Sequence, residues 1–176
     1  MESNALTQAR ALTPPAREAT LQRQASVSQF WDSNRQLLEA AWAEWEVENK
    51  DNLLIPDETL LDPRLRKAIN AAWQDPSKEN AVADLWEEII PGVYTAQFFD
   101  LERLAEFRDY LKAVANAQIP VRAPYGIQLN RFGMMLDPRS EGHLAAPNFQ
   151  AFYHDLMDRY MRPIARLLLD TYGFDN

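Results

Sequence analysis

The stretch of residues 91–117, PGVYTAQFFDLERLAEFRDYLKAVANA, carries the signals of a strand followed at once by a helix. Pro91-Gly92 is a turn signal, and the segment 93–99 after it is rich in β-branched and aromatic residues, which predicts a β-strand. Asp100 is a favoured N-cap residue, and the residues after it have apolar side chains at helical spacing: Leu104, Phe107, Leu111 and Val114. The chain is therefore expected to combine both kinds of secondary structure.

The residues before this stretch have mainly helical patterns. Apolar side chains recur at spacings of three and four over 17–49, and either one helix or two is possible, since Ser28 or Asp32 could cap a restart. Asp62-Pro63 supplies an N-cap followed by proline at the first helical position, which predicts a helix over 64–73 with Trp73 in the core. Another helix is predicted over 78–88.

The residues after the opening stretch add a second strand candidate at 126–136 and a polar loop at 137–147. A last helix begins near Asn148, and Pro163 should kink it. Two isolated strands do not make an independent sheet, so these strands are expected to need partners. We predict an α+β, predominantly helical fold, with a disordered arm at 1–16, a helical extension at 17–90 and a mixed region at 91–176.

Composition narrows the classes of function. The 176 residues have a formal net charge of −8, which repels phosphate backbones and anionic lipid, so neither nucleic-acid nor membrane binding is expected. The sequence has no cysteine, which excludes disulfides, thiolate metal sites and cysteine nucleophiles. It has neither a secretory-signal pattern nor an apolar stretch of ~20 residues, so a cytoplasmic protein is expected.

Few features of the sequence indicate a catalytic or ligand-binding site. Gly-x-Ser-x-Gly, a glycine-rich phosphate loop and Ser-x-x-Lys are all lacking. A metal site could be assembled from Asp137, Glu141 and His143, although their spacing matches no metal motif. The tryptophans have helical spacing that favours packing between helices over a ligand cage: Trp31, Trp42, Trp45, Trp73 and Trp86.

One segment is more specific, residues 125–137, YGIQLNRFGMMLD. It resembles the Asn-Arg-Tyr/Phe-Gly-x-x-Leu-Asp stretch of 2-oxoglutarate/Fe(II)-dependent oxygenases of the lysyl/prolyl-hydroxylase type. Segment 91–99 is similar to the entrance strand of that family. Segment 152–168 is similar to the helix that carries Tyr-x-Arg-Pro-x-Ala and precedes the catalytic barrel in that family. The resemblance covers roughly residues 85–176.

The resemblance implies that region 91–176 is the N-terminal support region of such an oxygenase, with its entrance strands and support helices. In the family a jelly roll (a double-stranded β-helix) follows, and it binds Fe(II) and 2-oxoglutarate through His-x-Asp, a later His and a basic residue. Neither His143 nor His154 is followed two residues later by a carboxylate, since Ala145 and Leu156 stand there. No catalytic or metal-binding residue therefore carries over.

Three polar residues of the matched strand, Tyr125, Asn130 and Arg131, are expected nearest the substrate entrance. The alternative interpretation gives Asn130 and Arg131 a structural role, in which they form hydrogen bonds with backbone groups and pair with Asp137.

The expected function is that of an N-terminal fragment of a dioxygenase (a hydroxylase), inactive alone because it lacks the iron-binding triad. Fe(II) and 2-oxoglutarate are expected for the full-length family and not for this chain. The expected partner is the missing C-terminal barrel or a chain that supplies it, and a truncated or interrupted reading frame would explain its absence. The alternative is a non-catalytic helical binding or scaffold module.

Overall fold

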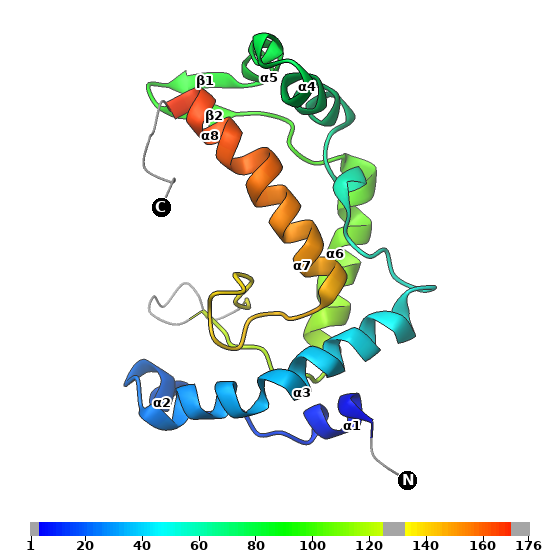
Figure 1. The fold of residues 1–176 in the computed structure, drawn as a ribbon, viewed down its shortest axis with the longest axis vertical. Helices are drawn as coiled ribbons and strands as arrows, with labels where there is room; N and C mark the ends of the chain where they lie inside the picture. Colours follow the sequence, from blue (N-terminus) through cyan, green and yellow to red (C-terminus); the bar gives the residue numbers. More distant parts are fainter. Residues whose placement is uncertain (1–3, 125–132, 170–176) are drawn as a thin grey trace. The chain divides into compact units, whose positions relative to one another are not determined.

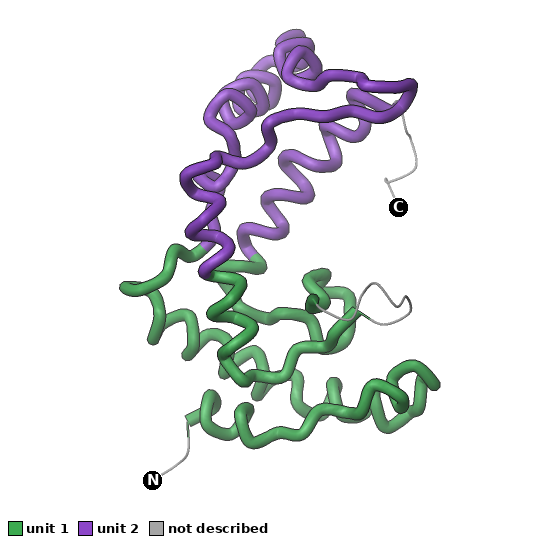
Figure 2. The backbone as a smooth tube through the Cα atoms, turned by 180° about the vertical axis from the view of Figure 1, so that it is seen from behind, with its two compact units in different colours: residues 1–55, 110–150 green, residues 56–109, 151–176 purple. Residues whose placement is uncertain are grey.

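The computed structural model describes residues 4–124 and 133–169. These residues form helices and a two-stranded antiparallel sheet (Figure 1), which confirms the predominantly helical α+β class. The chain divides into two compact units, each discontinuous in sequence (Figure 2). Unit 1 holds residues 1–55 and 110–150, and unit 2 holds residues 56–109 and 151–176, in place of the sequential regions 17–90 and 91–176 expected from the sequence.

Unit 1 begins with a helix where the sequence suggested a disordered arm. Helix α1 (Ala5–Arg10) lies beside α3 (Figure 1), and its Leu6 and Ala9 are 2% and 0% exposed. The Glu44 carboxylate on α3 accepts hydrogen bonds from the backbone N–H groups of Ala5 and Leu6, at 3.2 and 2.9 Å. A helix this short is not stable alone, so burial and capping by distant residues account for it.

The helical pattern over 17–49 forms two helices, α2 (Arg17–Leu21) and α3 (Ala25–Asn49). The break falls at Arg23, whose φ of 51° lies in the left-handed region where an α-helix cannot continue. Gln24 is the N-cap of α3, and it stands earlier than the caps considered at Ser28 and Asp32.

Helix α3 supplies most of the aromatic core of unit 1. Trp42 and Trp45 pack edge to face with ring centroids 5.4 Å apart, and Trp45 packs in the same way on Tyr110, at 5.9 Å. Tyr110 stacks on Phe149 at 6.0 Å. These four rings are at most 3% exposed, so the prediction that Trp42 and Trp45 pack between helices is confirmed.

A buried carboxylate from α3 caps the start of α7 (Pro147–Asp155). Glu46 is 3% exposed, and its two oxygens accept from the backbone N–H groups of Asn148 and Phe149, at 2.9 and 3.2 Å. Burial raises the pKa of Glu46, and the hydrogen bonds from Asn148 and Phe149 partly oppose that shift. The helix start near Asn148 is as predicted, but its cap comes from a residue far away in the sequence.

Unit 2 begins with η1 (Glu58–Leu60) and α4 (Pro63–Gln74). Asp62 accepts from the backbone N–H groups of Arg64 and Leu65, at 2.8 and 3.4 Å, which confirms the predicted N-cap. The Arg64 guanidinium also donates to Asp62 and is the main reason that the pKa of this carboxyl lies below its usual value.

The helix predicted over 78–88 is wrong beyond its first half. Segment η2 (Pro76–Lys78) and α5 (Asn80–Ala83) are short, and the chain then enters strand β1 (Glu87–Ile90). Strand β1 pairs antiparallel with β2 (Val93–Thr95), with Glu88 opposite Tyr94. The strand predicted over 93–99 is thus shorter, because only its first residues find a partner, although Phe99 also bridges to Leu61.

The last two predicted helices are present. Helix α6 (Leu101–Asn116) follows Asp100, which accepts from the backbone N–H groups of Glu102 and Arg103 as predicted. The final helix consists of α7, a π-helical segment η4 (Leu156–Met161) and α8 (Arg162–Leu169). The π-helical segment ends at Met161, two residues before Pro163, where the sequence predicted a kink.

The strand predicted over 126–136 lies mostly outside the described residues, and its described part, 133–136, forms neither strand nor helix. The polar loop expected over 137–147 is confirmed up to the residue before Pro147, where α7 begins. Within the described ranges, no helix has the length and apolar character that crossing a membrane requires.

Candidate functional site

The three polar residues that the sequence placed near a substrate, Tyr125, Asn130 and Arg131, lie outside the described residues. Their expected position at a substrate entrance stays a prediction.

The alternative metal ligands do not come together as a site. Arg139 donates to both oxygens of Asp137, with the shortest contact at 2.7 Å, and this interaction lowers the pKa of Asp137 to about 2. The His143 Nδ1 atom lies 3.0 Å from the carbonyl oxygen of Ser140. Among residues 4–124 and 133–169, no three His, Asp or Glu side chains are arranged to hold a metal ion.

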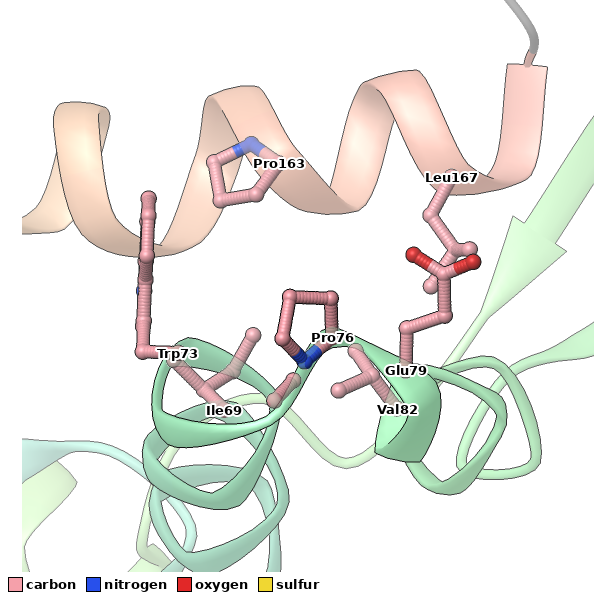
Figure 3. Close-up of a pocket in the computed structure, with 8 residues that line it drawn as sticks. Ile69, Trp73, Pro76, Glu79, Val82, Pro163 and Leu167 are labelled. Carbon is pink, nitrogen blue, oxygen red and sulfur yellow. The ribbon is translucent and has the colours of Figure 1, made fainter.

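The structure instead presents an apolar groove in unit 2, between α4, η2 and α5 on one side and α8 on the other (Figure 3). The volume of this groove is 210 Å³. We call it the unit 2 groove, and its lining is formed by Ile69, Ala72, Trp73, Pro76, Glu79, Val82, Pro163 and Leu167.

Two of the lining residues also explain how the last helix is held. Pro163 has no N–H group, so the carbonyl four residues earlier, that of Arg159, loses its usual α-helical donor. The Trp73 indole Nε1 donates to this Arg159 oxygen at 3.1 Å. In the π-helical segment the N–H of Arg162 bonds to the carbonyl of Met157, five residues back, as π geometry requires.

Much of the Trp73 side chain lies in solvent. Trp73 is 57% exposed, whereas the sequence predicted it in the core with the other tryptophans. Figure 3 shows its ring standing at one end of the groove, with Pro163 pointing toward the cavity from the helix opposite. A large exposed aromatic ring beside an apolar hollow is typical of a surface that receives a partner's side chain.

One acidic group lies at the other end of the groove. Figure 3 shows the Glu79 carboxylate next to Leu167. Glu79 is exposed and makes no ion pair with the residues that the structure describes. The groove therefore joins an apolar hollow to a negative rim.

Exposed apolar side chains are concentrated in unit 2. Ile89, Ile90 and Val93 on the β1–β2 hairpin are 62%, 60% and 48% exposed, and Leu169 at the end of α8 is 46% exposed. In unit 1, the exposed large apolar side chains among the described residues are Leu21 and Val47. Unit 2 is accordingly the better candidate for an interaction surface.

Sequence reasoning missed the groove. Its residues come from 69–82 and 163–167, and nothing in a linear pattern shows that these segments face one another. The sequence features that could have indicated the groove are Pro76 and Pro163, each of which interrupts a helical pattern beside apolar residues.

The chain was compared with protein-family models, with curated proteins and with solved structures, and no match was found in any of the three.

Proposed function

We propose that this chain is the N-terminal support region of a cytoplasmic 2-oxoglutarate/Fe(II)-dependent oxygenase of the lysyl/prolyl-hydroxylase type. The chain has no catalytic role of its own. Its unit 2 packs its exposed apolar side chains against a catalytic jelly roll, which is encoded in the same reading frame or by a partner chain. The jelly roll, and not this chain, binds Fe(II) and 2-oxoglutarate.

The proposal rests on the sequence resemblance over residues 85–176 together with one structural observation, the exposed β1–β2 hairpin. Ile90 and Val93 are paired in this hairpin, and both are about half exposed or more. A two-stranded hairpin is marginally stable by itself, and exposed apolar strands favour contact with further protein surface. A strand or face of a jelly roll is an appropriate partner for it.

The first experiment reads the nucleotide sequence that follows codon 176. We expect a frame, there or in an adjacent gene, that encodes His-x-Asp/Glu, a later His and a basic residue. Complete absence of such a frame would count against the proposal.

The second experiment measures succinate formation by purified chain 1–176 supplied with Fe(II), 2-oxoglutarate and a reductant. We expect no succinate above the protein-free background, because neither histidine forms the His-x-Asp/Glu pair. Turnover that depends on iron and scales with protein concentration would contradict the proposal.

The third experiment tests docking with the encoded jelly roll, expressed separately. We expect Ile90→Asp to weaken association by at least about tenfold, because a carboxylate buried without a partner is costly. Val47→Asp is the matched control, since Val47 is 66% exposed on α3 in unit 1. Equal effects of the two variants would mean that the hairpin is not the docking surface.

The unit 2 groove favours a second candidate, a non-catalytic binding module that takes an apolar side chain of a peptide. Glu79 at the rim would pair with a neighbouring Lys or Arg of that peptide. The two candidates differ in what the isolated chain does. A monomer that melts cooperatively and binds no apolar dye favours the binding module, whereas dye binding or aggregation favours the support region.

A further inference from the structure

A second cavity, within unit 1, has a different chemical character from the unit 2 groove. It lies between the start of α3 and the 137–142 loop and has a volume of 420 Å³. Three arginines and several hydroxyl groups line it, among them Arg23, Arg122, Arg139, Ser28 and Ser140. We call it the arginine pocket. Its volume falls within the range of about 300–1,000 Å³ that is usual for small-molecule sites.

Arg122, one of the lining residues, is held by its backbone. Its backbone N–H donates to the Gly142 carbonyl at 2.7 Å, and its carbonyl accepts from the Met135 N–H at 2.9 Å. The side-chain Nε is buried, and within residues 4–124 and 133–169 it has no hydrogen-bond partner. Arginine keeps its proton at ordinary pH, so Arg122 contributes a positive charge to the pocket lining.

The start of α3 adds positive potential on another side. Gln24 makes no side-chain capping bond to this 25-residue helix, and the first turn holds no acidic residue. The first N–H groups of a long helix carry a partial positive charge and favour an anion. Ser28 lies one turn into the helix and lines the same pocket.

The charge balance of the pocket is positive even after internal pairs are counted. Arg139 is engaged by Asp137, and Glu141 brings one carboxylate to the lining. Arg23 and Arg122 make no ion pair with the residues that the structure describes. A positive pocket on a chain of net charge −8 is a local feature that the overall composition hides.

We propose that the arginine pocket binds the phosphate group of a small molecule. Arginine side chains, hydroxyl groups and the N-terminal turn of α3 line the pocket, and a phosphate offers them more negative charge and more acceptor oxygens than a carboxylate does. The volume beyond what a phosphate fills accommodates a small organic group. This site lies in unit 1 and is independent of the docking role proposed for unit 2.

The test is calorimetric titration of chain 1–176 with inorganic phosphate, with glycerol 3-phosphate and with acetate, at low ionic strength. We expect both phosphates to bind, glycerol 3-phosphate more tightly, and acetate to bind at least about tenfold more weakly. Binding of inorganic phosphate alone would restrict the site to the free ion and overturn the small-molecule part of the proposal. No binding of either phosphate would overturn all of it.

Single substitutions test whether phosphate binds in the arginine pocket. Arg122→Gln should weaken phosphate binding by at least about tenfold, and the control Arg17→Gln, which removes the same charge from exposed α2, should leave it within about twofold. Ser28→Asp guards against a folding defect in Arg122→Gln, because an acidic residue in the first turn stabilises a helix. It should abolish binding while the far-UV circular dichroism stays native. Equal losses in Arg17→Gln and Arg122→Gln, or full binding by Ser28→Asp, would refute the assignment.

Discussion

Gly142 is the position where a single added carbon should be most costly. A Cβ atom built there lies 2.7 Å from Cδ2 and Cε3 of Trp31 and 2.9 Å from Cβ of Arg122, closer than real Cβ contacts. Trp31 is only 5% exposed, so its ring has little room to move. The φ of +66° adds a left-handed conformation that costs about 1–2 kcal/mol for a residue with a Cβ. Overpacking a core adds about 1–3 kcal/mol, so Gly142→Ala should lose about 2–5 kcal/mol.

Gly92→Ala separates the two contributions. Gly92 has a similar φ of +78°, but a Cβ there meets no atom within 4 Å, so only the conformational cost of about 1–2 kcal/mol applies. The assay is urea unfolding followed by far-UV circular dichroism and by tryptophan fluorescence, with the free energy of unfolding extrapolated to water. If Gly142→Ala lost no more stability than Gly92→Ala, the packing of Gly142 between Trp31 and Arg122 would be refuted.

Three further predictions concern single interactions. Trp73→Phe should lower the free energy of unfolding by about 0.5–1.5 kcal/mol, because the Arg159 carbonyl loses its indole donor; an unchanged urea midpoint would contradict this. The pKa of Glu46 is raised in the folded chain, so the stability of the wild type relative to Glu46→Gln should be greatest below pH 4.5, the usual pKa of Glu. This difference in stability should fall as the pH rises through the folded pKa. Urea unfolding at several pH values tests this, and the opposite slope would refute it. The pKa of Asp137 is lowered to about 2, so the stabilising effect of this carboxylate should be complete above pH 3.8 and be lost as the pH falls toward 2. In Arg139→Gln, NMR titration should find the pKa of Asp137 moved back toward 3.8. No movement would exclude Arg139 as the cause.

The candidate site could be anticipated from the sequence only in its local parts. Pro163 predicted an irregularity in the last helix, and the π-helical segment η4 ends two residues before this proline. The hydrogen bond from Trp73 to the Arg159 carbonyl, which lacks its usual helical donor, could not be predicted, since the two residues are 86 positions apart. Helical spacing placed Trp73 in the core with Trp42, and the outcome was 57% exposure for one and 0% for the other.

By itself the sequence determined the features that depend on neighbouring residues. Asp62 and Asp100 begin their helices as predicted, because a capping carboxylate bonds to N–H groups two and three residues ahead. Gly92 turns the chain between β1 and β2, because its positive φ is accessible to glycine without strain.

Tertiary structure alone decided the features that depend on residues far apart in the sequence. Helix α1 forms because Glu44 caps it and the core buries Leu6. Residues 87–90 become a strand rather than the end of a helix because β2 offers them backbone partners. The arginine pocket joins Arg23 to Arg122, from segments that linear periodicity treats as unrelated. In each case the stabilising contact joins distant segments, and a pattern read along the chain carries no information about which distant segments will meet.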